Sequence, residues 1–173
     1  MALADGDYLR AEEKAVEVVL ADTDAGGLRE SGSEAAATVS AGDEAIAKAF
    51  GQADFPAVLV RAAGKTESTA MPAYRLDKKF KLRFTVLHKS MDRNDAEEKV
   101  RKMASRLEKL LRDQTATDKQ FMGLPDFIEG SEGILVSSVP ETVFPDTAVE
   151  KEGLLARARL SAEVSVPCAF RYE

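Results

Sequence analysis

The stretch "KKFKLRFTVLHKSMDRNDAEEKV", residues 78–100, decides the fold class because its hydrophobic period changes partway along. Between residues 80 and 88, apolar and polar side chains alternate, and this period of two predicts a half-buried strand. Residues 95–112 instead repeat apolar side chains at helical spacing, which predicts an amphipathic helix of about five turns lying on a sheet. The apolar side of the strand is Phe80, Leu82, Phe84 and Val86, and that of the helix is Val100, Met103, Ala104, Leu107, Leu110 and Leu111.

The acidic cluster and the single histidine at this junction have a local structural explanation. Asp92 or Asp95 can cap the helix, whose unpaired N–H groups and positive dipole end favour carboxylates. His88 shares the parity of Phe84 and Val86, so we expect a partly buried imidazole at the rim of the sheet. A general base would need a nucleophile or a substrate proton within reach, and no neighbour in the sequence specifies one.

Further elements follow on both sides of the central stretch. The patterns predict a helix at 7–21, a short helix from Asp43 to Gly51, and strands at 55–63, 134–139 and 154–166. Small polar residues and glycines fill 22–43, which predicts a long flexible loop or arm, and 141–153 is the predicted loop of a closing hairpin. This order predicts the α+β class, with a mixed, mainly antiparallel sheet and helices packed on one face.

Composition and charge limit the classes of protein that need to be considered. The chain has 173 residues, of which 45% are hydrophobic and 31% charged, and this fits a single domain spanning residues 1–173. Neither a signal-peptide pattern nor an apolar run of about 18 residues occurs, so we expect a soluble cytoplasmic protein with no membrane partner. The net charge of −6 makes the nucleic-acid backbone an unfavourable main partner, and no sequence-specific nucleic-acid binding is predicted.

No pattern in the sequence predicts a catalytic residue, a metal site or a cofactor. Asp22 and Asp24 imitate the start of a calcium loop, but Gly26 occupies a ligand position and Ser33 stands in place of the bidentate glutamate. The single cysteine, Cys168, excludes an intramolecular disulfide and is most simply a small buried hydrophobe. The glycine-rich phosphate-binding loop of nucleotide folds is absent.

The distinctive features of this chain are surfaces. Cationic side chains occupy the polar sides of two predicted strands, which would form one charged sheet face if the strands were neighbours. An ordinary solvated face is the alternative. Phe144, in the loop 141–153, would form an apolar plug for a neighbouring subunit, because loops this long often become ordered on assembly. The candidate interface residues are Lys79, Lys81, Arg83, Phe144, Arg157, Arg159 and Glu163.

The order of elements over residues 44–166 resembles the small tail-completion, or tail-terminator, proteins of long-tailed bacteriophages and prophages. The resemblance rests on a leading helix, the strand entry "DFPAVLVR", the strand-to-helix stretch "HKSMDRNDAEEKVRKMASRLEKLL" and the closing "ARARLSAEVSV". It implies a structural protein without enzymatic activity or cofactor, which forms a ring homo-oligomer, usually a hexamer. The implied partners are the tail tube protein and the head-connector protein, and the implied location is the virion tail, after assembly in the bacterial host cytoplasm. Segment 22–43 has no counterpart in the common pattern of this family.

Three other classes of function remain open at this stage. One is a different virion or injection-system subunit, such as a tube, baseplate or head–tail joining protein. Another is a small ligand-binding or hydrolase domain, which a deep apolar pocket with perturbed acids would favour. The third is an RNA-binding split βαβ sheet, which the net charge and the lack of a paired aromatic platform disfavour.

Overall fold

A computed structural model describes residues 6–30, 35–70, 75–116, 118–127 and 136–169 of the chain. Among these residues, no helix combines the length and the apolar character needed to cross a membrane. The helices are α1 (Asp7–Leu20), α2 (Arg93–Asp113) and α3 (Gln120–Phe127), with the 3-10 helices η1 (Glu44–Ala49) and η2 (Gln52–Asp54). The strands are β1 (Thr38–Ala41), β2 (Ala57–Ala70), β3 (Arg75–Ser90), β4 (Val136–Val143), β5 (Ala148–Glu150) and β6 (Gly153–Ala169).

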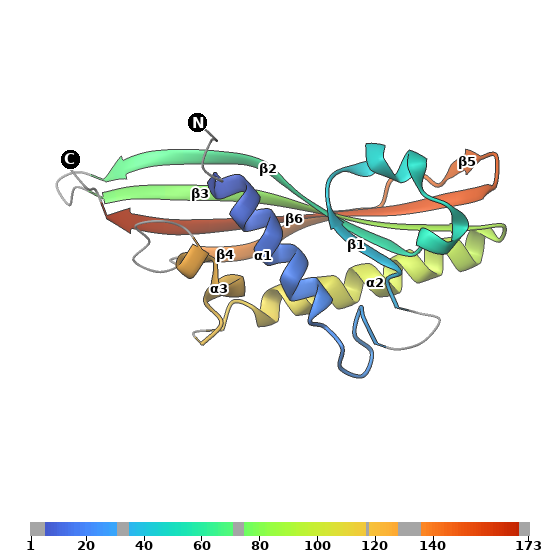
Figure 1. The fold of residues 1–173 in the computed structure, drawn as a ribbon, viewed down its shortest axis with the longest axis horizontal. Helices are drawn as coiled ribbons and strands as arrows, with labels where there is room; N and C mark the ends of the chain where they lie inside the picture. The colour runs from blue at the N-terminus through green and yellow to red at the C-terminus, as the bar shows by residue number, and fades with distance from the viewer. Residues whose placement is uncertain (1–5, 31–34, 71–74, 117, 128–135, 170–173) are drawn as a thin grey trace, which may run out of the picture.

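The strands form one long, mixed sheet, which confirms the predicted α+β class (Figure 1). The strand order is β1-β2-β3-β6-β4, and β5 pairs with β6 beside β4. Only the β1–β2 pair is parallel in the described sheet, and its other pairs are antiparallel. The antiparallel neighbours β3 and β6 are in register from Arg75 opposite Ala169 to Ser90 opposite Leu154, so together they form the spine of the sheet.

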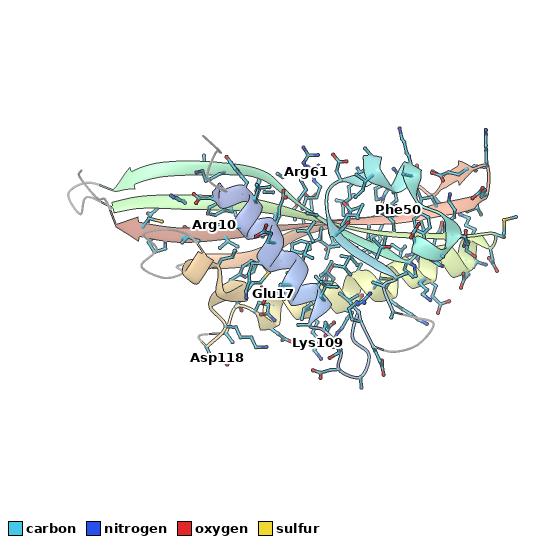
Figure 2. The ribbon with its side chains drawn as sticks, in the orientation of Figure 1. Arg10, Glu17, Phe50, Arg61, Lys109 and Asp118 are labelled. Carbon is cyan, nitrogen blue, oxygen red and sulfur yellow. The ribbon has the colours of Figure 1, made fainter. Side chains whose placement is uncertain are left out.

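Two apolar clusters lie on opposite faces of this sheet. The larger cluster joins one face of β2, β3 and β6 to the buried sides of α1, α2 and α3, as the alternation in β3 and the helical spacing in α2 predict. The smaller cluster, on the other face, contains Phe55, Leu59, Leu87 and Leu155, with Phe50 packed against it. The α-helices therefore pack on one face as predicted, while the two short 3-10 helices lie over part of the other face (Figures 1 and 2).

The structure also corrects several predicted boundaries. Segment 22–43, predicted as a long loop or arm, contains β1, which pairs with β2 through Thr38 opposite Ala57. The predicted hairpin loop 141–153 contains the end of β4 and all of β5. The strand predicted to stop before Pro140 continues to Val143, with an irregularity of the ladder between Ser138 and Glu141 that accommodates the proline on this edge strand. The first part of that predicted strand, residues 134 and 135, lies outside the described residues.

Candidate interaction surface

The predicted charged residues of β3 and β6 lie on adjacent strands and on the same side of the sheet. The β3–β6 register places Lys81 opposite Glu163 and Arg83 opposite Ser161. Lys79 follows the same parity on β3, and all three β3 cations are exposed. The polar sides of the two strands thus form one charged face, which we call the β3–β6 face: Lys79, Lys81, Arg83, Arg157, Arg159 and Glu163.

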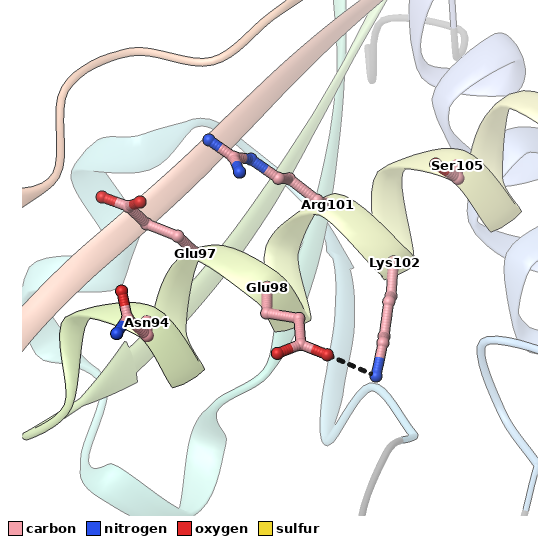
Figure 3. A pocket seen from close by; sticks show the side chains of 6 residues that line it. All are labelled: Asn94, Glu97, Glu98, Arg101, Lys102 and Ser105. Atoms are coloured by element: carbon pink, nitrogen blue, oxygen red, sulfur yellow. Dashed lines mark ion pairs between the residues drawn. The ribbon is translucent and has the colours of Figure 1, made fainter.

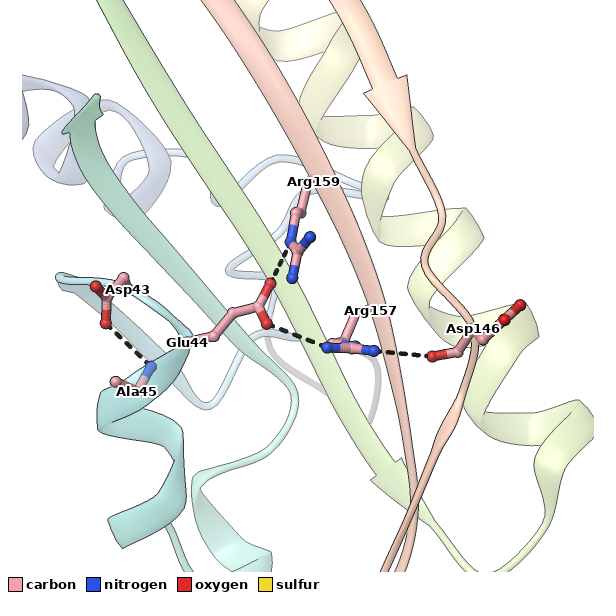
Figure 4. A network of polar contacts seen from close by, with 6 residues as sticks. All are labelled: Asp43, Glu44, Ala45, Asp146, Arg157 and Arg159. Atoms are coloured by element: carbon pink, nitrogen blue, oxygen red, sulfur yellow. Dashed lines mark hydrogen bonds and ion pairs between the residues drawn. The ribbon is translucent and has the colours of Figure 1, made fainter. Parts of the chain in front are cut away.

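One end of the β3–β6 face is covered from within the chain by Glu44, the first residue of η1 (Figure 4). Its carboxylate accepts a hydrogen bond from Arg159 Nε on one oxygen and from Arg157 Nη1, at 3.3 Å, on the other. The Arg159 hydrogen bond and the two positive charges hold the pKa of Glu44 below its ordinary value, although partial burial opposes this shift. Arg157 Nη2 also donates to the backbone oxygen of Asp146 at 3.0 Å. Arg157 and Arg159 are therefore occupied by contacts inside the subunit.

Glu44 was not predictable as a partner of these arginines, because no local pattern in the sequence shows that η1 lies over the strands. The neighbouring Asp43 caps η1 through the Ala45 N–H at 3.0 Å (Figure 4) and also pairs with Arg61 of β2. The sequence signal was a capping aspartate, Asp43, followed by Glu44. The partners of these two acids depend on where η1 lies against the sheet, which the local sequence does not show.

The other end of the β3–β6 face is open to solvent. Within the described part of the chain, no hydrogen bond or ion pair involves the side chains of Lys79, Lys81 and Arg83. Beside them a hollow of about 270 Å³ lies between β2 and β6, where Gly64 carries no side chain and Glu163 supplies one carboxylate. The three cations are thus available for an external partner or for water.

A second candidate surface is the sheet edge formed by β4 and β5. Both strands pair with β6 on the edge away from β3, and the ladder is interrupted between Val143 and Ala148. Phe144, predicted as an apolar plug, follows β4 directly and is 48% exposed. Val143 and Val149 on the same edge are 43% and 83% exposed. This apolar edge is named the β4–β5 edge below.

A hollow of about 170 Å³ lies between the β4–β5 edge and α2. Its lining includes Arg93 and Arg101 of α2, Arg157 of β6, and the linker residues Phe144 and Asp146. A more open hollow of about 610 Å³ lies along the outer side of α2 (Figure 3). Figure 3 shows Arg101 and Glu97 directed to one side of α2, while Glu98 and Lys102 point to the other and form a 2.8 Å ion pair.

His88 lies where its parity predicts, at the end of β3 on the side of α2. Its side chain is 12% exposed, with Nε2 at 3.6 Å from Asp95 Oδ2. Burial and the positive charge of Lys99 lower the pKa of His88 despite the opposing effect of Asp95, so the imidazole is neutral at neutral pH. Asp92 is the helix cap, because its Oδ1 accepts from the Asn94 N–H at 2.8 Å. The segment around His88 and Asp92 is therefore the end of β3 followed by the capped start of α2.

Asp22 does not serve a calcium loop in this structure. Its carboxylate accepts hydrogen bonds from the Leu28 N–H at 2.8 Å and from Arg106 Nε at 3.0 Å, and it is buried. Cys168 is buried in the larger apolar cluster, as predicted for a small hydrophobe. Among the described residues, no group of three His, Cys, Asp or Glu side chains is placed to hold a metal ion.

Comparisons with known proteins find similar chains among solved structures. No protein-family model matches the chain, and no curated protein matches it. Among solved structures, a chain from the "Virion of native gene transfer agent (GTA) particle" is similar, with a TM-score of 0.39 and 14% sequence identity. The match covers 96% of this chain and 99% of that chain.

Proposed function

We propose that this protein is a structural subunit of a phage or prophage tail, and specifically a tail terminator whose ring caps the tail tube. In this role it is not an enzyme and needs no cofactor. Its partners are further copies of itself, the tail tube protein and the head-connector protein, in a tail assembled in the bacterial host cytoplasm. The element order of residues 44–166 supports the family assignment, and the six-fold symmetry comes from that resemblance alone.

The exposed β4–β5 edge carries the proposal of an assembling subunit. Monomeric proteins usually protect an edge strand with charges, with a bulge or with a covering element, since an open edge is a template for another chain. Here Pro140 and the ladder irregularity around it protect the first part of this edge. Val143, Phe144 and Val149, in contrast, leave the part beyond it apolar and exposed. Such an edge is expected where another polypeptide completes the surface.

The opposite boundary of the sheet differs from the β4–β5 edge. There β1 covers the first residues of β2, and Glu12 of α1 then accepts the Ala62 N–H at 2.7 Å. Two unlike boundaries are what a heterologous contact requires, because such a contact joins different surfaces of successive subunits. When the rotation between subunits closes, this arrangement gives a ring.

Native mass spectrometry at rising protein concentration, with negative-stain images of the same sample, tests the proposal. We expect a discrete hexamer with a ring outline. The variant Phe144→Asp is expected to raise the concentration at which the ring forms by about tenfold or more, because a charge would be buried at the contact. The control is Leu9→Asp on α1, since Leu9 is 50% exposed and Phe144 is 48% exposed.

Three results would contradict the proposal. A particle that stays monomeric at every concentration would favour a ligand-binding or enzymatic domain. Equal ring formation by Phe144→Asp and the wild type would show that the β4–β5 edge is not the contact. A larger or helical assembly, in contrast to a closed ring, would favour a tube or baseplate subunit over a terminator.

A further inference from the structure

The interruption of the β4–β5 edge creates a small hollow with unusual chemistry. The β4–β6 ladder ends with Val143 opposite Arg159, and the β5–β6 ladder begins with Ala148 opposite Leu155. Between these points the linker 144–147 leaves the ladder, and the hollow of about 170 Å³ opens between the linker and α2. Its size suits one side-chain group of a partner better than an extended polymer.

The hollow collects three guanidinium groups from two elements. Arg93 and Arg101 come from α2, and Arg157 comes from β6. Arg101 is exposed and forms no hydrogen bond or ion pair with the described residues. Arg157 has a buried Nε for which the described residues provide no acceptor. Arg157 is already held by Glu44 and Asp146, and its open Nε is buried. Arg101 is therefore the exposed guanidinium at this place that retains hydrogen-bonding capacity toward a partner.

The carboxylates at the hollow do not use up this capacity. Glu97 Oε1 accepts from Arg93 Nε at 2.8 Å and from Thr147 Oγ1 at 2.8 Å, and these contacts lower the pKa of Glu97. Asp146 also lines the hollow, and its backbone oxygen accepts from Arg157. Glu97 holds Arg93 and the linker in place and attracts Arg101 electrostatically, but no hydrogen bond with the described residues fixes the Arg101 guanidinium, which can turn to a new anion.

We propose that this hollow binds a carboxylate side chain of a protein partner, with Arg101 as the principal contact and Phe144 as its apolar neighbour. Guanidinium groups bind carboxylates through paired, charge-assisted hydrogen bonds. A nucleic-acid backbone fits less well, because Glu97 and Asp146 line the hollow and would repel successive phosphates. The inference names the chemistry of the partner at the proposed assembly edge, and its test does not require a ring.

Isothermal titration calorimetry of the full chain with an end-blocked hexaglutamate peptide tests this inference. We expect weak, saturable binding that Arg101→Gln weakens about tenfold, while Arg101→Lys keeps the charge but recovers the affinity only in part. Lys102→Gln is the matched control, because it makes the same charge change one residue along α2, on a side chain paired with Glu98 at 2.8 Å. The control is expected to bind like the wild type.

Three results would overturn the inference. Equal losses in Arg101→Gln and Lys102→Gln would show non-specific attraction to a cationic surface. Absence of saturable binding would remove the carboxylate site. Tighter, Arg101-dependent binding of a short duplex DNA or of inorganic phosphate would assign the hollow to phosphate chemistry. A monomeric protein whose peptide binding depends on Arg101 would refute the ring and leave this inference standing, so the two failures are distinguishable.

Discussion

Replacing Arg106 with methionine tests how the turn after α1 is held against α2. The Asp22 side chain is 3% exposed, and Arg106 reaches it from α2 with both Nε and Nη2. The same carboxylate accepts the buried Leu28 N–H at 2.8 Å. Arg106→Met keeps most of the packing of the stem but leaves a buried carboxylate without its counter-ion, so the folded state is expected to lose stability.

The expected loss is about 3 kcal/mol in the free energy of unfolding. Removing one partner of a buried ion pair costs about 3–5 kcal/mol, because the remaining charge stays desolvated. Arg106 is 22% exposed, so water can partly reach the pair and the lower end of this range applies. For a chain of 173 residues, this corresponds to a fall in Tm of about 9 °C.

The control and the pH dependence make the test specific. Arg112→Met removes an ion pair with Glu108 from the same helix, but the Arg112 side chain is 65% exposed. This control variant should therefore lose no more than about 0.5 kcal/mol of unfolding free energy. Burial raises the pKa of Asp22, yet the hydrogen bonds from Arg106 and Leu28 outweigh it and leave that pKa below its ordinary value. The stabilisation is therefore complete above about pH 4, the pKa of an unfolded aspartate, and is lost as the pH falls through the folded pKa.

Urea unfolding followed by circular dichroism, from neutral pH into acid, measures these effects. The difference between the wild type and Arg106→Met should shrink once Asp22 is protonated, because a neutral carboxyl no longer needs a counter-ion. Equal losses in Arg106→Met and Arg112→Met, or a difference that does not change with pH, would refute the assigned role of the pair.

Three further predictions concern the stability of the same chain and are checked by urea unfolding at neutral pH. Gly153→Ala should lose about 1–3 kcal/mol, because the residue has a φ of 138° and an added Cβ would lie 2.9 Å from Ser90 O; a loss below about 0.5 kcal/mol would contradict this. Leu107→Ala should lose about 3 kcal/mol, since its side chain is fully buried in the larger cluster, and an unchanged midpoint would show that the core collapses around the cavity. Glu44→Gln should lose about 1 kcal/mol, and because the Arg159 hydrogen bond lowers the pKa of Glu44, the difference should shrink as the pH falls below the ordinary glutamate pKa and vanish below the lowered folded pKa; a loss that persists in strong acid would contradict the charge pairing.

Elements defined by their own side-chain pattern were predictable from the sequence. The helix predicted at 95–112 is observed as Arg93–Asp113, since its caps and its apolar stripe are local properties. β3, predicted at 80–88, extends to Arg75–Ser90, because pairing with β2 and β6 continues past the clean alternation. Strand β1 is only four residues long, TVSA, and shows no distinctive alternation. It was not predictable because its extended conformation depends on pairing with β2.

The candidate surface was predictable only in part, for a related reason. Alternation placed Arg157 and Arg159 on the same side of β6 as Glu163, and this side faces the same way as the cations of β3. Parity along a strand does not show whether another element lies over that side. Glu44, brought by η1, pairs with both arginines inside the subunit, which leaves Lys79, Lys81 and Arg83 as the open part of the face.

Because Glu44 already pairs with Arg157 and Arg159, the β4–β5 edge is a better candidate for the proposed subunit contact than the β3–β6 face. Phe144 and Arg101 line one hollow, so a single partner segment can cover the phenyl ring and place a carboxylate beside the guanidinium. Covering the exposed half of Phe144 would contribute about 1 kcal/mol of apolar burial, which is too little to select a partner. In this proposal the Arg101 guanidinium discriminates between partner segments, because a segment without an acid at that position would leave Arg101 without its hydrogen bonds. Affinity at this edge therefore depends on how many apolar residues the partner covers, whereas the choice of partner and its register depend on one carboxylate.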